Sequence, residues 1–199
     1  ITKQRINDYE PSQVIIINSI FPHKLAKFCN NMNIRLIHLS TDCVFSGKKG
    51  FYGIEDKPDA EDLYGKTKID GEIIYPNTLT LRKSTIGFEL DNKKGLLEWL
   101  IKQKGEINGF TNAIYSGVTS LELSKIILYI IENKKNLEGI YHVSSKPIDK
   151  YTLLKKLKDK FKLNSVSIKP YKDFTCDRSL DGKDFIKKTG YQIPDWDEM

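Results

Sequence analysis

"STDCVFSGKKGFYGIEDKPDAEDLYGKTKIDGE", residues 40–72, is the stretch that decides which fold to expect. It starts with hydroxyl and carboxyl side chains directly after an apolar run, crosses a glycine-containing loop, and ends in a charged segment typical of a solvated helix. Tyr64 precedes Lys68 by four residues, so both side chains lie on one face of that helix. The stretch therefore predicts a strand, a loop and a helix, with polar side chains where the strand ends.

The pairing of Tyr64 with Lys68 suggests proton transfer. A nearby ammonium favours the phenolate and lowers the pKa of a tyrosine, which can then exchange a proton with a carbonyl or alcohol oxygen. Ser40 and Thr41 stand at the predicted strand end, where open α/β sheets bind ligands. Such a set needs a hydride partner, normally a nicotinamide. Taken alone, the pair is equally consistent with an exposed tyrosine and lysine on a surface helix.

Outward from this stretch, short apolar strands alternate with amphipathic helices. We expect strands over residues 14–17, 34–40, 78–84 and 139–145. We expect helices over residues 21–32, 62–74, 95–105, 120–135 and 149–161, and a short helix in the tail. Asp62 and Asp149 are the candidate N-caps of two of these helices. The alternation predicts an α/β fold with a Rossmann-like, doubly wound parallel sheet.

The strands become sparser after about residue 105, so a smaller C-terminal lobe is expected. Residues 109–117 are interpreted as a loop. The first 46 residues contain no glycine, whereas a doubly wound nucleotide fold needs a glycine-rich turn after its first strand. Either the protein binds no dinucleotide, or the N-terminal part of the fold is missing from this chain.

Composition narrows the class of protein. The 199 residues, 39% of them hydrophobic and 29% charged, are typical of one soluble globular domain. No apolar run approaches the roughly 20 residues of a membrane span, so we expect no membrane association. The net charge of +6 comes from scattered lysines, which indicate a solvated lysine-rich surface rather than a nucleic-acid site. An anionic small substrate would fit the mild positive field. The three cysteines and three histidines lack the spacing of a disulfide framework or a metal site, so we expect reduced thiols and a cytoplasmic protein.

Several linked motifs give the chain a specific resemblance. They are STDCVFSG (40–47), YGIED (52–56), YGKTK (64–68) and GE (71–72). Together they resemble the signature of the extended short-chain dehydrogenase/reductases, and most of all the dTDP-4-dehydrorhamnose reductase family of sugar-nucleotide reductases. The similarity continues through LRKSTIG, GIYHVSS and, more loosely, DRSL near the C-terminus.

The resemblance implies an NADPH- or NADH-dependent reduction of the C4 ketone of a nucleotide-linked 4-keto-6-deoxy sugar, for surface polysaccharide synthesis. Tyr64 would protonate the ketone oxygen, Lys68 would hold the nicotinamide ribose and lower the Tyr64 pKa, and Thr41 would hydrogen-bond the substrate. The implied catalytic residues are Thr41, Tyr64 and Lys68. The implied cofactor contacts are Leu39, Tyr64 and Lys68. The implied substrate contacts are Thr41, Asp42, Cys43, Ser84, Thr85, Asn112 and Tyr115. No metal is implied.

Departures from the family pattern leave the substrate open. Cys43 replaces the family's usual tyrosine, and Thr85 stands where a tryptophan is frequent. dTDP-4-dehydrorhamnose and a UDP-N-acetyl deoxysugar relative are equally consistent. The family's first strand and glycine-rich turn are absent, and the predicted strand 14–17 runs directly into Asn18. We therefore expect residues to be missing before Ile1 and between Val14 and Asn18.

The resemblance also suggests a division of the chain and two alternative functions. Residues 1–105 would form a partial NAD(P)-binding Rossmann-like domain with the catalytic residues, and residues 106–199 a mixed segment holding the substrate lobe, a returning strand and helices. A nucleotide-sugar epimerase or dehydratase, and a non-catalytic regulatory subunit with this fold, are the alternatives. NADPH against NADH, and a homodimer against other oligomeric states, stay open.

Overall fold

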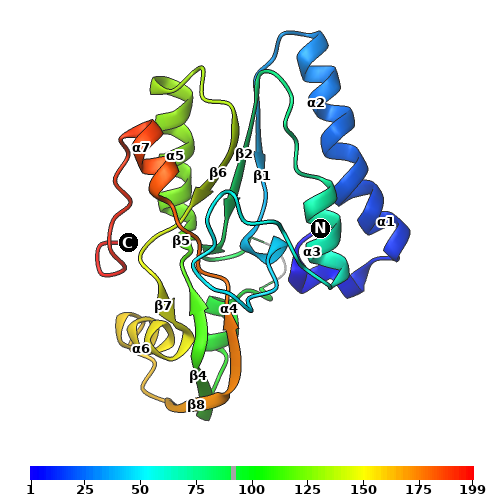
Figure 1. The fold of residues 1–199 in the computed structure, drawn as a ribbon. Coiled ribbons are helices and arrows are strands. Elements are labelled where there is room, and N and C mark those ends of the chain that lie inside the picture. Colours follow the sequence, from blue (N-terminus) through cyan, green and yellow to red (C-terminus); the bar gives the residue numbers. More distant parts are fainter. Residues whose placement is uncertain (91–92) are drawn as a thin grey trace.

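The computed structural model describes residues 1–90 and 93–199. A three-stranded parallel sheet with the order β1-β2-β6 forms its centre. The strands are β1 (Leu36–Leu39), β2 (Thr78–Lys83) and β6 (Gly139–Val143). Figure 1 shows α2 (Phe21–Asn31) and α3 (Leu63–Asp70) on one side of this sheet, and α5 (Ser120–Asn133) and α7 (Lys183–Thr189) on the other. The predicted α/β fold with a parallel sheet is confirmed.

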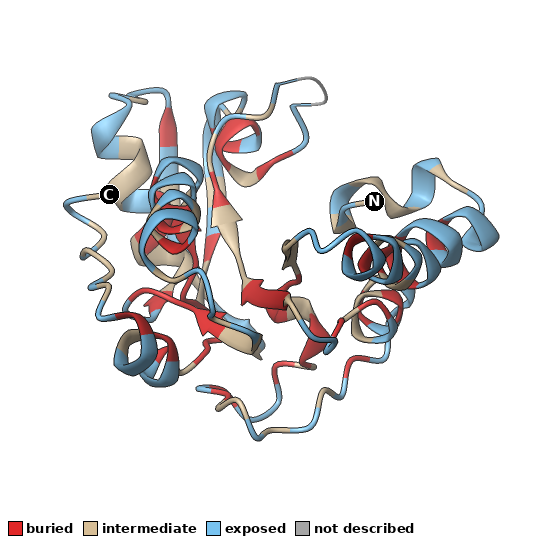
Figure 2. Cartoon of the chain, turned by 90° about the horizontal axis from the view of Figure 1, so that it is seen from above, coloured by how far each residue is buried: buried red, intermediate tan, exposed pale blue. Residues whose placement is uncertain are grey.

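The core forms where the sheet meets α5 and α7. Leu79 and Leu81 of β2 pack with Ile126 and Ile130 of α5 and with Phe185 of α7, and all five side chains are fully buried. Buried residues run through the strands and the inner sides of the helices in Figure 2. Burial of aliphatic side chains at about 1.5–3 kcal/mol each therefore holds the sheet and its helices as one unit.

The N-terminal segment differs from the prediction. Residues 14–17 belong to a helical stretch composed of η1 (Lys3–Asp8), α1 (Pro11–Ile15) and η2 (Ile16–Ile20), and α2 follows without a break. The N–H of Ile16 bonds to the carbonyl of Ser12, and the N–H of Phe21 to that of Ile16. The strand predicted over residues 14–17 is therefore wrong.

Local helix signals explain this outcome. Pro11 occupies the first helical position, where its fixed φ suits a helix. The side chains of Glu10 and Gln13 each bond to the other's backbone N–H in a capping box. These start signals outweigh the β preference of the valine and isoleucines that follow.

A second lobe follows β2. It contains β7 (Ile148–Asp149), β4 (Gly105–Tyr115) and β8 (Val166–Asp177), in the order β7-β4-β8, with α4 (Leu96–Ile101) and α6 (Lys150–Lys160) beside them. β4 pairs with β8 in parallel and with β7 in antiparallel fashion. Two short strands, β3 (Thr85–Ile86) and β5 (Val118–Thr119), pair in parallel nearby. A three-residue 3-10 turn, η3 (Asp42–Val44), follows β1.

Two local expectations in this lobe are wrong. The helix expected over residues 95–105 ends at Ile101, and residues 109–115 lie in β4 rather than in a loop. Gly105 has a φ of +72° and starts β4 rather than ending α4. The other predicted strands and helices are present with shifted ends, and Asp62 and Asp149 cap α3 and α6 as expected.

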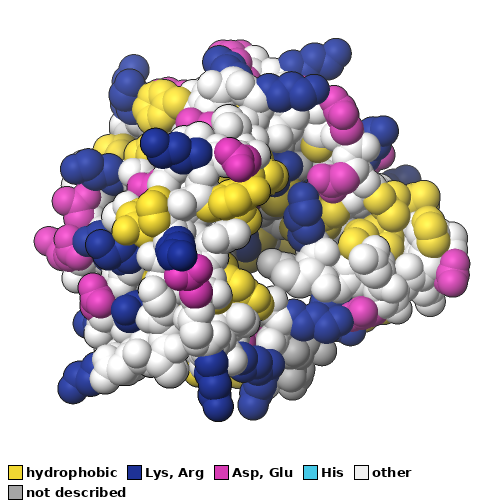
Figure 3. All heavy atoms as spheres, turned by 90° about the horizontal axis from the view of Figure 1, so that it is seen from below, with side chains coloured by type: hydrophobic (Ala, Val, Ile, Leu, Met, Phe, Trp, Pro, Cys, Tyr) yellow, Lys and Arg dark blue, Asp and Glu magenta, His cyan; other side chains and the backbone are white. Residues whose placement is uncertain are grey.

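Surface charge, helix hydrophobicity and possible metal ligands are the features that relate to binding partners. Lys and Arg side chains are scattered among acidic and apolar ones on the face drawn in Figure 3. None of the helices in the described part of the chain combines the length and apolar character that crossing a membrane requires. Across residues 1–90 and 93–199, no group of three His, Cys, Asp or Glu side chains is arranged to hold a metal ion.

Candidate active site

The end of β1 is fixed by a buried polar network. Ser40 Oγ donates to Glu72 Oε1 at 2.7 Å, and Arg82 donates to both oxygens of the same carboxylate, from Nε at 2.8 Å and from Nη2 at 2.7 Å. The side chains of Arg82 and Glu72 are only 5% and 7% exposed. Ser40 is therefore committed to this network, and the chain beyond it is held at the carboxyl ends of β1 and β2.

Close packing of α3 brings Tyr64 to the same place. Asp62 caps the helix by accepting the N–H of Gly65 at 2.9 Å. A Cβ added at Gly65 would lie 2.5 Å from the Cys43 carbonyl oxygen and would collide with Ala60. Only glycine fits there, so the first turn of α3 lies directly against the turn that follows β1.

A 360 Å³ cavity opens where these elements meet. It lies between η3, the start of α3, the segment after β2, and Tyr115 and Lys150 of the second lobe. The sequence-predicted residues that line it are Thr41, Asp42, Cys43, Tyr64, Ser84, Thr85 and Tyr115. The structure therefore brings together seven of the nine predicted substrate and catalytic residues.

Three predicted residues lie outside this lining. Lys68 donates from Nζ to the carbonyl oxygen of Leu39 at 2.9 Å, so two of the three predicted cofactor contacts bond to each other. Asn112 is exposed on β4 and donates to the carbonyl of Lys172 on β8 at 3.0 Å. The register of β4 with β8 sends this side chain away from the cavity.

Burial controls the electrostatics of the site. Burial raises the pKa of Tyr64, and the neighbouring Cys43 raises it further. Burial lowers the pKa of Lys68 to about 8, and the positive charge of Lys83 adds to this effect. The prediction that Lys68 lowers the Tyr64 pKa is wrong in this geometry, because Lys68 bonds to Leu39 and burial dominates. Tyr64 therefore keeps its phenolic proton at physiological pH.

In the turn that follows β1, Cys43 stands where the family usually has a tyrosine, and its side chain is uncharged. Burial and then the charge of Asp42 raise the pKa of the Cys43 thiol to about 12. Thr41 Oγ1 donates to Asp42 Oδ1 at 3.1 Å and accepts the N–H of Cys43 at 3.2 Å. Cys43 thus presents an uncharged thiol to the cavity.

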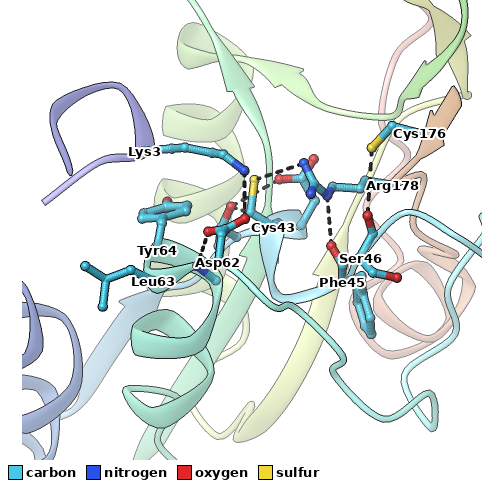
Figure 4. A network of polar contacts seen from close by, with 12 residues as sticks. Lys3, Cys43, Phe45, Ser46, Asp62, Leu63, Tyr64, Cys176 and Arg178 are labelled. Atoms are coloured by element: carbon cyan, nitrogen blue, oxygen red, sulfur yellow. Dashed lines mark hydrogen bonds and ion pairs between the residues drawn. The ribbon is translucent and has the colours of Figure 1, made fainter. Parts of the chain in front are cut away.

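Arg178 belongs to the DRSL segment near the C-terminus and contacts the turn that follows β1. Its Nε donates to the carbonyl of Phe45 at 2.8 Å, and Nη1 lies 4.0 Å from Cys43 Sγ (Figure 4). Cys176 Sγ lies 3.9 Å from the carbonyl of Ser46. Residues far apart in the sequence therefore set the position of the Cys43 thiol.

Two lysines of the cavity wall were missed by the sequence reasoning. Lys83 follows Arg82 at the end of β2, and Lys150 follows the cap residue Asp149 at the start of α6. Burial lowers the pKa of both amines, that of Lys150 to about 8. Their positions in the sequence, one at a strand end and one at a helix start, could have indicated that both lysines line the cavity.

The polar groups present fit a carbonyl substrate and a nicotinamide ribose. Thr85 Oγ1 and Tyr115 Oη are buried and have no hydrogen-bond partner among the described residues. Buried hydroxyls are normally paired, so these two are exceptions in the cavity wall. Tyr64 and Thr41 add a phenol and a hydroxyl to the lining, and the Lys68 ammonium, bonded to the Leu39 carbonyl, lies outside it.

Comparison with known proteins places this geometry in a family context. The model of the family described as "RmlD substrate binding domain" matches residues 7–181. A dTDP-4-dehydrorhamnose reductase of Sinorhizobium fredii (strain NBRC 101917 / NGR234) is 27% identical over 147 residues, covering 68% of this chain and 49% of the relative. Methionine adenosyltransferase 2 subunit beta of Xenopus laevis is 24% identical over 188 residues, covering 84% and 54%.

A solved structure is similar over the whole chain. The dTDP-4-dehydrorhamnose reductase of Bacillus anthracis str. Ames in complex with NADP has a TM-score of 0.83 and 25% identity, covering 100% of this chain and 74% of that one. The chain spans about half the length of the curated relatives described above.

Proposed function

The chain belongs to the RmlD substrate-binding domain family, and we propose that it takes part in reducing the C4 ketone of a nucleotide-linked 4-keto-6-deoxy sugar. NADPH or NADH is the proposed cofactor, as supported by the NADP complex of the similar Bacillus anthracis reductase. The observation that carries the proposal is the convergence of Thr41, Asp42 and Tyr64 on one cavity at the carboxyl ends of β1 and β2. The proposed setting is surface polysaccharide synthesis in the cytoplasm, with dTDP-4-dehydrorhamnose or a UDP-N-acetyl deoxysugar as substrate.

Each residue has a defined part in this proposal. A bound reduced nicotinamide supplies the hydride that reaches the carbonyl carbon. Tyr64 donates its phenolic proton to the ketone oxygen, and its raised pKa keeps that proton in place until the oxygen becomes basic. Thr41 Oγ1 orients the same oxygen. Lys68, held by the Leu39 carbonyl, lies on the same helix as Tyr64 and would hold the ribose of the cofactor.

A second candidate function is a non-catalytic subunit. The similarity to a methionine adenosyltransferase subunit extends over 84% of the chain, and Lys68 bonds to a backbone carbonyl rather than to Tyr64. A subunit of this kind would keep the cavity for ligand binding without turnover.

The test measures oxidation of NADPH and of NADH with a panel of dTDP- and UDP-linked 4-keto sugars. We expect turnover with at least one sugar, and a loss of about 10²–10⁴-fold in kcat for Tyr64→Phe, the range for removal of a general acid. Tyr171→Phe, on β8 outside the cavity, is the matched control and should retain the parent rate. A Tyr64→Phe variant as fast as the parent would refute the role of the phenol. Ligand binding without any oxidation would support the subunit.

A further inference from the structure

The helix that carries Tyr64 and Lys68 has little apolar surface to fix its orientation. Of the eight residues of α3, which lies wholly in the described part of the chain, only Gly65 and Thr67 are buried. Ile69 packs from a partly buried position against a neighbouring apolar cluster. Helices in proteins are stabilised mostly by packing of an apolar face, so the rotation of α3 about its own axis depends largely on other contacts.

Such contacts come from η2, the segment directly before α2. The N–H of Phe21 bonds to the carbonyl of Ile16, five residues earlier, so this turn is wider than that of an α-helix. Asn18 and Ser19 lie within the turn and are only 4% and 7% exposed. Both side chains reach the same residue of α3, Thr67, which is itself 3% exposed. The wide turn therefore presents two buried polar side chains to α3.

Thr67 is bonded through its hydroxyl and through its carbonyl. Its Oγ1 donates to the carbonyls of Leu63 and Tyr64, at 2.8 and 3.0 Å. The same oxygen accepts from Asn18 Nδ2 at 3.4 Å. Ser19 Oγ donates to the Thr67 carbonyl at 3.0 Å. Thr67 therefore connects η2 to the helical turn that carries Tyr64.

The end of α3 lies against the same wide turn. A Cβ added at Gly71 would collide with the carbonyl oxygen of Asn18, so glycine permits the close approach of the two backbones. Residues three apart are neighbours on a helix, so Thr67 lies beside Tyr64. A side-chain tip lies roughly 5–6 Å from the helix axis. A rotation of α3 by about 10° would therefore move the phenol by about 1 Å.

Building on the proposed function, we infer that Ser19 and Thr67 are positioning residues that fix the rotation of α3. That rotation places the phenol of Tyr64 at the cavity, and it places the amine of Lys68 2.9 Å from the carbonyl of Leu39. Neither positioning residue is among the described residues that line the cavity, so both act through α3 rather than on the substrate. A displacement of about 1 Å at a reacting group can cost about 10²-fold in rate.

Thr67→Val removes the hydroxyl with little change of shape, and Thr189→Val is its matched control. Thr189, on α7, is 1% exposed and donates its hydroxyl to the carbonyl of Phe185, four residues earlier, at 2.7 Å. Its hydroxyl accepts the N–H of Tyr191 at 3.1 Å, and its carbonyl accepts the hydroxyl of Tyr129 at 2.9 Å. The two threonines make the same kinds of bond on different helices. Both variants should therefore lose a similar amount of Tm, roughly 2–12 °C.

Steady-state kinetics on the full chain separates position from stability. With the 4-keto sugar that is turned over, Thr67→Val should lower kcat about ten- to hundredfold. KM should change by less than about threefold, because the substrate contacts are intact. Thr189→Val should stay within about twofold of the parent in both constants. Thr67→Ser restores the hydroxyl and should recover most of the rate, whereas Ser19→Ala should lower kcat by a smaller factor than Thr67→Val.

A second measurement needs no turnover. Acetylation by acetic anhydride, resolved by peptide mass spectrometry, reports how accessible each lysine amine is. Lys68 should react several-fold faster in Thr67→Val than in the parent, because a rotated α3 withdraws the amine from the Leu39 carbonyl. It should react at the parent rate in Thr189→Val. Lys66, on the exposed side of α3, is the internal reference and should react equally in every variant.

Equal losses of kcat in Thr67→Val and Thr189→Val would overturn the inference, because lost stability alone would then explain both. A Thr67→Val variant with the kcat and the Lys68 reactivity of the parent would overturn it too, as would one that raised only KM. If Thr67→Val fails to fold, the same criteria apply to Ser19→Ala, with Tyr129→Phe as the control that loses the corresponding bond on α7. A parent that oxidises no cofactor contradicts the proposed function alone, since acetylation of Lys68 then decides the inference.

Discussion

Replacing Glu72 with glutamine should destabilise the protein strongly, although the two side chains have nearly the same shape. Glu72 accepts three hydrogen bonds from Ser40 and Arg82 at 2.7 to 2.8 Å, inside a network that is 5% to 7% exposed. The substitution leaves the Arg82 guanidinium buried without its counter-charge. Breaking one partner of a buried pair costs about 3–5 kcal/mol, a large share of the roughly 5–15 kcal/mol that holds a domain together.

The magnitude converts into a measurable shift. At about 2–4 °C per kcal/mol for a chain of this size, Tm should fall by roughly 6–20 °C. Urea and thermal unfolding followed by circular dichroism measure the loss. The control is Glu61→Gln, which breaks an ion pair of similar length, 2.8 Å to Lys48, between side chains that are 77% and 75% exposed. That variant should unfold like the parent.

The comparison of the two variants separates burial from pairing. Equal, small effects of Glu72→Gln and Glu61→Gln would refute the reasoning, because the Glu72 pair would then be as weakly coupled to folding as the exposed one. A large effect at Glu72 alone supports the network as the anchor of the strand end that carries Thr41.

Two further predictions concern α3 and the buried lysines. Gly65→Ala should lower both Tm and activity, because the added Cβ collides with the Cys43 carbonyl and moves Tyr64. The control Gly53→Ala meets only the Asp56 carboxylate at 3.7 Å and should be mild. Parallel unfolding and activity assays check this, and a fully active, stable Gly65→Ala variant contradicts it. Burial lowers the pKa of Lys68 from 10.5 to about 8. The unfolded chain therefore binds more protons between these two values, and the free energy of unfolding should rise with pH from about 8 to 10.5. Lys68→Met should flatten this rise in urea titrations across that range, and an unchanged slope would count against a buried Lys68 amine with a lowered pKa.

Local patterns in the sequence were sufficient for the alternating architecture. Apolar runs of strand length next to amphipathic segments predicted β1, β2 and β6 and the helices beside them, because burial of one face imposes a period that can be read from neighbouring residues. The caps Asp62 and Asp149 were equally readable, since a cap bonds to an N–H only a few residues away. Position at the predicted strand end pointed to Ser40 and Thr41, whereas Asp42 and Tyr64 were assigned through the resemblance to the reductase family.

The errors arose where one local signal concealed another. The isoleucines of residues 14–17 favoured a strand, but Pro11 and the Glu10–Gln13 capping box start a helix that runs through them. Residues 109–115 lacked a continuous apolar run, yet they form β4 because β8, sixty residues later in the chain, supplies its hydrogen-bond partner. A strand stabilised by a distant partner has little local signature.

Periodicity, caps and motif spacing were enough to predict the fold class and the residue types at the site, because all three are properties of neighbouring residues. The tertiary structure decided the chemistry of those residues. It turned Lys68 towards Leu39, raised the Tyr64 pKa and excluded Asn112. It also added Lys83 and Lys150 to the cavity. Burial and charge depend on side chains that only the folded chain brings together, so the pKa values and free hydroxyls of this cavity could be known only from its three-dimensional arrangement.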